Sequence, residues 1–252
     1  MLKTIAFINQ KGGSGKTTSA VNVGAGLSRL GKKVLAVDMD PQANLTYHLG
    51  IKPADIRGTI SDILEGRAAA DETILERGGL DVIPATLDLA ETEARIFNEA
   101  GREHILKGAL AGSRRAYDYV LVDCPPSLGL LTLNALTAVR EAYIPLEARA
   151  LSLQGLRAIR KIVDLVKQRL NPDLTIAGIF VTQYDSRPAL TGEVMETLKE
   201  HFGELLFKTV IRTNIRLAEA PSYGKDIFAY APRSHGAEDY MELCREIIKR
   251  SK

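Results

Sequence analysis

Lys11-Gly12-Gly13-Ser14-Gly15-Lys16-Thr17-Thr18 lies between an apolar, β-branched run at residues 2–9 and a helical pattern at residues 17–30. Glycines in such a loop let the chain turn with positive φ and bring backbone N–H groups against phosphate oxygens, and the helix N-terminus adds unpaired donors. The ammonium of Lys16 is placed to reach β- and γ-phosphates, and the hydroxyl of Thr17 is placed for Mg²⁺. The strict P-loop pattern begins with glycine at position 10, where this chain has Gln10. We therefore predict a variant P-loop that binds a nucleoside triphosphate and Mg²⁺.

The composition is that of an ordinary globular protein. Of 252 residues, 45% are hydrophobic and 25% charged, and 33 Lys and Arg against 31 Asp and Glu give a net charge of +2, so any nucleic-acid site must be local. The two cysteines, Cys124 and Cys244, are too few for a disulfide framework, and no apolar run approaches the ~20 residues of a membrane span. These features favour one cytoplasmic domain.

Apolar runs alternate with amphipathic stretches along the whole chain, which predicts βα units. We expect an α/β fold with a mostly parallel, twisted sheet and helices on both faces. The predicted strands are Leu2–Asn9, Lys33–Asp38, Leu80–Pro84, Tyr117–Asp123, Glu141–Pro145, Thr175–Thr182 and Leu205–Ile211. The predicted helices are Thr17–Leu30, Thr59–Leu64, Arg102–Leu110, Leu130–Val139, Leu153–Leu170, Gly192–Phe202 and Ala237–Lys249. The segment Pro41–Gly58 is expected to be a long loop.

Carboxylates follow two of these strands. Asp123 ends the apolar run from Tyr119, an arrangement that presents a carboxylate to magnesium-bound water beside a P-loop. Asp38 and Asp40 end another strand, and adjacent strand ends of a parallel sheet converge where ligands bind. Either of these two could orient a water molecule.

Four motifs together resemble the ParA/MinD group of deviant Walker-type P-loop ATPases, and more narrowly the short, Soj-like ParA proteins. They are Lys11-Gly12-Gly13-Ser14-Gly15-Lys16-Thr17-Thr18, Asp38-Met39-Asp40-Pro41-Gln42, Asp123-Cys124-Pro125-Pro126, and Ile215-Arg216-Leu217-Ala218-Glu219-Ala220-Pro221-Ser222-Tyr223-Gly224-Lys225. The resemblance implies a single ATPase domain over residues 1–252. Because the P-loop begins within a dozen residues of Met1, no separate N-terminal DNA-binding domain is expected.

The resemblance also implies a homodimer that forms with ATP, in which Lys11 reaches the nucleotide of the partner subunit. A cation supplied in trans can act as an arginine finger does, because phosphoryl transfer depends on positioning and on charge neutralisation. In the same reading Lys16 acts in cis, Thr17 binds Mg²⁺, Asp123 holds its water shell and Asp40 positions the attacking water. The catalytic residues are thus Lys11, Lys16 and Asp40.

The adenine of ParA relatives packs against a segment similar to Ile-Pro-Arg-Asn, which aligns here with Ile211-Arg212-Thr213-Asn214. Arg212 replaces the proline, so its contact is expected through the backbone, and Asn214 is carried over to the base pocket. Thr182, Tyr184 and Asp185 match a neighbouring family segment. The stretch Ile144–Leu151 departs from the family pattern, with Arg149 in place of an acid, which leaves the cargo open between chromosome, plasmid and another large assembly.

Arg216 matches the DNA-contact arginine of the family, and Lys225 lies in the same motif. The resemblance therefore implies binding to nonspecific double-stranded DNA, a nucleoid-associated location, and a ParB-like protein that stimulates hydrolysis; Lys199, Lys208, Arg245, Lys249 and Arg250 are further cations nearby. The main alternative is a MinD-like membrane-associated ATPase, because Tyr240, Met241, Leu243, Cys244, Ile247 and Ile248 form an apolar stripe. That stripe continues the last domain helix, which disfavours lipid binding. An iron–sulfur carrier and a small-molecule kinase are weaker alternatives.

Overall fold

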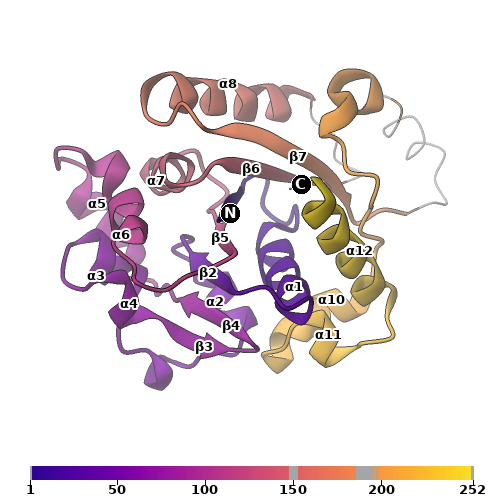
Figure 1. The fold of residues 1–252 in the computed structure, drawn as a ribbon, viewed down its shortest axis with the longest axis horizontal. Coiled ribbons are helices and arrows are strands. Elements are labelled where there is room, and N and C mark those ends of the chain that lie inside the picture. Colours follow the sequence, from indigo (N-terminus) through magenta and orange to yellow (C-terminus); the bar gives the residue numbers. More distant parts are fainter. Residues whose placement is uncertain (1, 148–152, 186–195, 197, 251–252) are drawn as a thin grey trace.

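The computed structural model describes residues 2–147, 153–185, 196 and 198–250 (Figure 1). Within them seven strands form one sheet in the order β3-β4-β2-β5-β1-β6-β7. The strands are β1 (Lys3–Phe7), β2 (Val34–Asp38), β3 (Leu75–Arg77), β4 (Leu80–Ile83), β5 (Tyr119–Asp123), β6 (Glu141–Glu147) and β7 (Thr175–Thr182). All neighbouring pairs are parallel except β3 with β4. The predicted parallel α/β architecture is confirmed.

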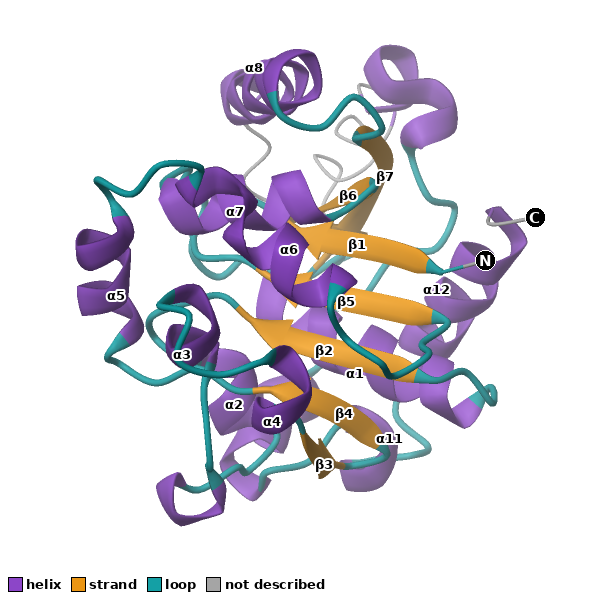
Figure 2. Ribbon diagram, turned by 60° about the vertical axis from the view of Figure 1, so that its left-hand side comes forward, coloured by secondary structure: helices purple, strands orange, loops and turns teal. Residues whose placement is uncertain are grey.

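Helices cover both faces of this sheet (Figure 2). The α-helices are α1 (Lys16–Arg29), α2 (Asn44–His48), α3 (Ile60–Leu64), α4 (Ala70–Thr73), α5 (Leu89–Ile96), α6 (Ile105–Ala111), α7 (Leu130–Ala138), α8 (Leu153–Arg169), α10 (Ile215–Glu219), α11 (Ile227–Tyr230) and α12 (His235–Arg250). Short 3₁₀ helices are η1 (Pro53–Asp55), η2 (Arg102–His104), η4 (Gly203–Leu205) and η5 (Ala220–Tyr223). Across the described residues, no helix combines the length and the apolar character needed to cross a membrane.

Side chains alternate between the two faces of each strand, so the sheet separates two apolar cores. In β1, Ala6 faces the core that contains α7 and α8, whereas Ile5 and Phe7 face the core that contains α1 and α12. Strands buried on both faces carry near-continuous apolar runs, which is why residues 119–122 were recognisable as a strand. The apolar stripe of α12 is buried in the second core, where Tyr240, Leu243 and Ile247 are each at most 1% exposed. These side chains are therefore not available to a lipid surface in this conformation.

The predicted strand Leu205–Ile211 is wrong. The backbone N–H groups of Phe207 and Ile211 do donate to β7, each at 2.8 Å, but the N–H groups of Lys208 and Thr209 between them donate to the carboxylate of Glu246 on α12, each at 3.0 Å. A side chain thus satisfies the donors that a further strand would have used, and only an isolated bridge at Leu206 remains. The apolar pattern of this segment reflects burial against β7.

The predicted long loop Pro41–Gly58 is also wrong, because it contains α2 and η1. Sequence periodicity missed the three-residue edge strand β3 and the short helices α4, α5, α10 and α11. The predicted helix Gly192–Phe202 lies partly outside the described residues. Its described part, residues 196 and 198–202, is helical. Arg149 also lies outside them.

The carboxyl ends of the central strands place the candidate site. β1 lies between β5 and β6, and the chain leaves β1 toward β2 on one side and later crosses to β6 on the other. In this register Phe7 is opposite Asp123, and Asp123 is opposite Asp38. Residues 8–15 therefore connect β1 to α1 at the topological switch point, where open α/β sheets bind ligands.

Candidate functional site

The loop from Asn9 to Gly15 has the backbone geometry of a phosphate cradle. Gly13 and Gly15 have φ values of 73° and 90°, a region that favours glycine, and Gly15 caps the N-terminus of α1. A Cβ on Gly15 would also stand 3.3 Å from the side chain of Thr182. The first N–H groups of α1 and its positive dipole end consequently point into the space that the loop encloses.

Hydrogen bonds with β6, with β7 and with the residue after β7 fix this loop in place. Thr182 donates its hydroxyl to the carbonyl of Ser14 at 2.9 Å, and the amide of Gln183 donates to the carbonyl of Gly13 at 2.7 Å. On the other side, Asn9 donates to the carbonyl of Pro145 at 2.8 Å. The loop is therefore held without a ligand, and Thr182, whose role the sequence left open, is one of its anchors.

Lys16 is the buried cation of the site. It is the first residue of α1 and is only 6% exposed. Its ammonium donates to the carbonyl of Lys11 at 3.3 Å. Burial lowers the pKa of Lys16, while the carboxyls of Asp123 and Asp40 oppose that shift. A cation held this way gains more from an incoming phosphate than one in water, because the local dielectric is low.

Three aspartates lie at the adjacent strand ends. Asp38 is fully buried and accepts from the N–H and hydroxyl of Thr46 at 2.9 and 2.7 Å, and burial raises the pKa of Asp38 to about 6. Asp40 is 5% exposed and accepts from the N–H of Gln42 at 2.9 Å. Asp38 is thus engaged in holding α2, whereas Asp40 lines the cavity.

Asp123 carries the least compensated charge. It is 0% exposed, and neither carboxylate oxygen accepts a hydrogen bond from any described residue. Burial and the neighbouring Asp38 raise the pKa of Asp123 well above its usual value, although the nearby Thr17 hydroxyl and Lys16 ammonium act in the opposite direction. A buried, unpaired carboxylate is costly unless something binds it.

The donor set at Asp123 and Thr17 fits Mg²⁺. Mg²⁺ takes oxygen ligands, keeps several waters, and is usually held by one or two carboxylates together with substrate phosphates. Among the described residues there is no group of three or more His, Cys, Asp or Glu that could bind a metal by itself. A Mg²⁺ here would therefore depend on the nucleotide for part of its coordination.

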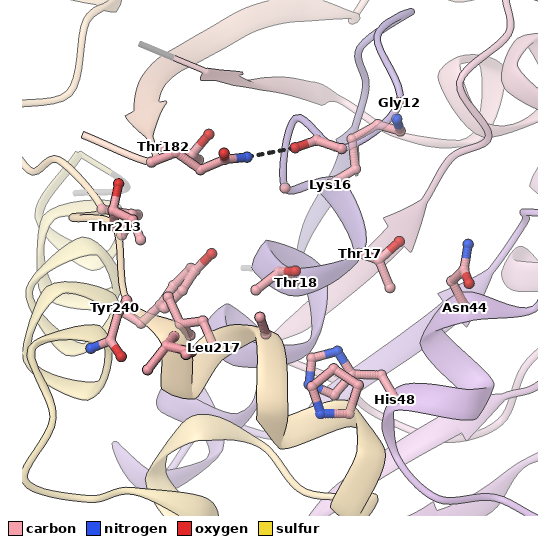
Figure 3. Close-up of a pocket in the computed structure, with 18 of the residues that line it drawn as sticks. Gly12, Lys16, Thr17, Thr18, Asn44, His48, Thr182, Thr213, Leu217 and Tyr240 are labelled. Carbon is pink, nitrogen blue, oxygen red and sulfur yellow. Dashed lines mark hydrogen bonds between the residues drawn. The ribbon is translucent and has the colours of Figure 1, made fainter. Parts of the chain in front are cut away.

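A cavity of about 770 Å³ extends from the P-loop to the segment after β7 (Figure 3). Its phosphate end is lined by Gly12, Gly13, Gly15, Lys16, Thr17, Thr18 and Asp40, with Thr182 and Gln183 beside the loop, and its far end by Ile211–Ile215, Leu217 and Tyr240. The hydroxyls of Tyr240 and Ser19 are 3.0 Å apart, which joins α12 to α1 beneath the cavity. Its size and its mixed lining suit a nucleotide.

Arg212 and Asn214 both line the far end, but neither offers its whole side chain to a ligand. The guanidinium of Arg212 is held by Asp239, with Nε at 3.0 Å from both carboxylate oxygens, and its backbone N–H donates to the same carboxylate at 2.9 Å. Asn214 caps α10 by accepting from the N–H of Arg216 at 2.9 Å. The charge of Arg212 is therefore directed to α12.

Lys11 lies apart from Lys16. Its ammonium is ion-paired with Glu147 at the end of β6, its side chain is 48% exposed, and Lys11 is not among the residues that line the nucleotide-sized cavity. Its backbone is fixed, since its N–H donates to Asn9 at 3.0 Å and its carbonyl accepts from Lys16. The two lysines of the motif thus serve different spaces.

The predicted DNA residues are exposed and belong to the segment whose neighbouring residues line the cavity. Arg216, in α10, has a side chain that is 54% exposed and pairs with Glu219 at 2.8 Å, and Tyr230 donates to the same carboxylate at 2.9 Å. Lys225 is exposed and follows η5. Arg250, by contrast, packs on Phe207 and donates to the carbonyl of Leu206 at 2.7 Å, which gives it a structural role.

Sequence reasoning missed Gln183, Tyr240 and His48, all of which line the cavity. His48 is 2% exposed, and burial lowers the pKa of His48 to about 4, so it is neutral. Tyr240 belongs to an apolar helical stripe, and no local signal separates it from its core neighbours. Gln183, with φ of 51°, follows a strand and resembles any polar strand end.

These features define the class of protein as a P-loop NTPase. Its elements are a parallel sheet, a glycine-rich loop between the central strand and a helix, a buried lysine at the start of that helix, and carboxylates at neighbouring strand ends. Known proteins agree. Residues 2–176 match the family described as an AAA domain. The chain is 48% identical to the sporulation initiation inhibitor protein Soj of Bacillus subtilis over 249 residues, which cover 98% of each chain. It is 44% identical to the chromosome partitioning protein ParA of Myxococcus xanthus, with 98% of this chain and 88% of that protein covered.

Among solved structures, the cobyrinic acid a,c-diamide synthase of Mycobacterium smegmatis with bound ADP and magnesium matches with a TM-score of 0.87 and 34% identity, over 99% of this chain and 95% of that one. The septum site-determining protein MinD of Pyrococcus horikoshii, complexed with Mg-ADP, matches with a TM-score of 0.79 and 26% identity, over 100% and 98%. The chain therefore belongs to the ParA/MinD family of P-loop ATPases, on its Soj-like chromosome-partition branch. Family and fold together support an ATPase of the partition type.

Proposed function

We propose that this protein is an ATP-dependent dimerising switch that binds nonspecific DNA and hydrolyses ATP, with a ParB-like partner, to segregate or position DNA or another large cargo. The observation that carries the proposal is Asp123, a fully buried carboxylate with no hydrogen bond from a described residue, next to Lys16 in a preformed phosphate loop. Such a site is incomplete without a cation and a polyphosphate. The relatives named Soj and ParA support the partition role.

Residues of the phosphate end divide the work of binding and hydrolysis. Residues 12–18 surround the phosphates with N–H donors, and Lys16 neutralises charge on the β- and γ-phosphates in cis. Thr17 holds Mg²⁺ through its hydroxyl, and Asp123 holds the water shell of that ion. Bound Mg²⁺ supplies charge neutralisation at the phosphoryl group. Asp40, which lines the cavity and has one oxygen bonded to a backbone N–H, positions the attacking water.

Lys11 completes the site of the partner subunit. Its side chain is half-exposed and directed to Glu147, outside the cavity of its own subunit, which supports action in trans. Because two subunits must close before this lysine reaches a nucleotide, hydrolysis by the free subunit should be slow, and a stimulating partner would act on the closed state.

At the far end of the cavity, residues 211–214 border the base. We assign Asn214 to the base pocket and Arg212 to a contact through its backbone, since its guanidinium is held by Asp239. This assignment explains how an arginine can occupy the position of a family proline. The guanidinium is directed to Asp239, and this ion pair replaces the rigidity that proline would give.

Arg216 and Lys225 form the proposed DNA contact, and closure of the dimer brings two copies onto one surface. Contacts to phosphate need charge and no base readout, so affinity should fall steeply with salt. The net charge of +2 is no obstacle, because dimerisation doubles a weak basic patch and so makes DNA binding depend on ATP. We place the protein in the cytoplasm on the nucleoid, as one ATPase domain over residues 1–252.

DNA binding distinguishes this proposal from a membrane-associated MinD-like ATPase. Purified protein is titrated with nonspecific duplex DNA and with anionic liposomes in the presence of no nucleotide, ADP, or ATP with Mg²⁺, across a salt series. We expect DNA binding with ATP only and no liposome binding, since the apolar stripe of α12 is buried. Liposome binding without DNA binding would overturn the proposal.

A matched pair of arginine variants tests the DNA surface. Arg216 and Arg245 are similarly exposed, at 54% and 58%, and each pairs with a glutamate three residues away in its own helix. Arg216→Ala should weaken DNA binding about 10-fold or more and lower the salt slope by about two per dimer, whereas Arg245→Ala should change little. Equal effects of the two variants would remove Arg216 from the site.

A further inference from the structure

The neighbouring strands β1 and β6 are joined by an ion pair at each edge of the sheet. At the amino edge, Lys3 of β1 pairs with Glu141 of β6 at 2.5 Å. At the carboxyl edge, Lys11, just after β1, pairs with Glu147, the last residue of β6. The first pair lies far from the nucleotide cavity, and the second holds the lysine that the proposed function sends to the partner subunit.

The pairing at the carboxyl edge is built from fixed parts. The backbone of Lys11 is held on both sides, by Asn9 and by the ammonium of Lys16, so only its side chain is free to change direction. The side chain of Glu147 is 18% exposed and sits beside a cavity of about 280 Å³ between the P-loop and α8. One ammonium cannot rest against this carboxylate and also reach a nucleotide on another subunit.

We propose that Glu147 is a positioning residue for Lys11: its carboxylate holds the ammonium in the free subunit and must release it when two ATP-bound subunits close. This inference rests on the proposed trans role of Lys11. The contact would oppose dimerisation until ATP supplies a stronger anion, because phosphate oxygens compete with a single, partly hydrated carboxylate. It would thereby suppress closure of subunits that lack a triphosphate.

The size of the effect follows from exposure. Exposed ion pairs shift an equilibrium by roughly twofold to fivefold each. Each dimer must release two such pairs, so the product is roughly 4- to 25-fold in the dimerisation constant. The proposal therefore predicts a measurable but moderate restraint.

Glu147→Gln and Glu141→Gln provide a matched test, since each removes the charge of one glutamate of β6 and keeps its shape. The dimerisation constant is measured by sedimentation with a non-hydrolysable ATP analogue and Mg²⁺, and nucleotide affinity of the free subunit is measured with ADP. We expect Glu147→Gln to dimerise roughly 4- to 25-fold more tightly than wild type at unchanged ADP affinity, and Glu141→Gln to match wild type. Equal or weaker dimerisation of Glu147→Gln would overturn the inference.

Lys11→Ala separates this inference from the proposed function. If Lys11→Ala dimerises and hydrolyses ATP as wild type does, the trans role fails, and the restraint fails with it. If Lys11→Ala is defective while Glu147→Gln behaves as wild type, the restraint alone fails. The double variant Lys11→Ala with Glu147→Gln should dimerise no better than Lys11→Ala, because the effect of Glu147 acts through that lysine. A gain in the double variant would contradict the mechanism.

Discussion

The two ends of the nucleotide cavity are built on opposite principles. The phosphate end consists of strand ends and a helix start, and its charges are buried and poorly paired, as Asp123 and Lys16 show. The far end consists of a loop and the edge of α12, and its charges are satisfied within the protein, as the ion pair of Arg212 with Asp239 shows. One end is electrostatically incomplete, and the other is complete.

This difference indicates where nucleotide binding draws its free energy. A ligand that brings Mg²⁺ and phosphates to the first end neutralises groups whose burial is already costly. At the second end, a base adds packing and a few hydrogen bonds to residues that are already paired. We therefore expect affinity to depend mainly on the phosphate end, and discrimination among bases on the far end.

The largest expected effect is that of Lys16→Ala. Removing this lysine, which is buried in the cavity lining, should weaken ATP binding by a single subunit roughly 100-fold or more, because a charged contact in a low-dielectric site is lost. Calorimetric titration of the variant with ATP and Mg²⁺ measures this. Lys11→Ala is the control and should bind within about threefold of wild type under conditions that keep the protein monomeric. Similar losses in both variants would mean that the two lysines share one site.

A second large effect concerns Asp123→Asn in the absence of nucleotide. Burial raises the pKa of Asp123 and takes the pKa of Asp38 to about 6, so both carboxyls destabilise the native state once they ionise. The contribution of each carboxyl to the free energy of unfolding is largest at low pH, where the carboxyl is protonated. This contribution is lost as the pH rises from about 4 through the pKa of the folded state. Asp123→Asn should therefore raise the free energy of unfolding by about 1–3 kcal/mol at pH 7.5 and by almost nothing at pH 4.

Denaturant titrations at the two pH values check this prediction. The control is Asp173→Asn, which makes the same change at an exposed residue in a turn. The gain should disappear, or reverse, when wild type is saturated with ATP and Mg²⁺, because the ligand stabilises only the wild-type site. A loss of stability in Asp123→Asn at pH 7.5 without ligand would show that the carboxylate is already compensated, and the contrast between the two ends would be lost.

A smaller effect is expected at the far end. Arg212→Ala removes the guanidinium contacts with Asp239 and leaves only the backbone N–H of residue 212 to hold this segment against α12. It should lower ATP affinity roughly 3- to 10-fold while leaving affinity for inorganic triphosphate unchanged. Arg115→Ala is matched in exposure, at 45% against 42%, and breaks the pair with Asp81 away from the cavity. It should change neither affinity. An equal loss for ATP and triphosphate in Arg212→Ala would mean that the two ends are not independent.

The smallest effects concern backbone strain beside the cavity. Ala43, before α2, and Gln183, after β7, both have φ of 51°, which disfavours side chains. Ala43→Gly should stabilise the fold by less than about 1 kcal/mol, since relief of strain exceeds the added entropy of the unfolded chain. Gln183→Gly loses the hydrogen bond to Gly13 and should be less stable than Ala43→Gly by about 0.5–1.5 kcal/mol. Equal gains in chemical denaturation would show that Gln183 does not anchor the P-loop.

The two ends also differ in how far sequence predicts them. The phosphate end depends on contiguous residues, the P-loop motif and the apolar strands that end in Asp38 and Asp123, so local pattern was sufficient to bring them together. The far end depends on residues distant in sequence, such as Tyr240, whose neighbours are set by tertiary packing. The wrong prediction of a strand at residues 205–211 has the same origin. The backbone N–H groups of Lys208 and Thr209 donate to Glu246, which lies in α12 and is distant in sequence. The pairing of Lys11 with Glu147, 136 positions apart, was likewise invisible in the sequence.

The central claim, that Lys11 serves the nucleotide of the partner subunit, is tested most directly by mixing two inactive variants. Lys16→Ala subunits keep Lys11 but cannot bind ATP productively, and Lys11→Ala subunits bind ATP but lack the lysine in trans. If Lys11 acts across the interface, a mixed dimer contains one complete site, and an equimolar mixture should hydrolyse ATP at up to about a quarter of the wild-type rate, since half of the dimers are mixed and each has one of two sites. A mixture that stays at the sum of the two separate rates would contradict the account.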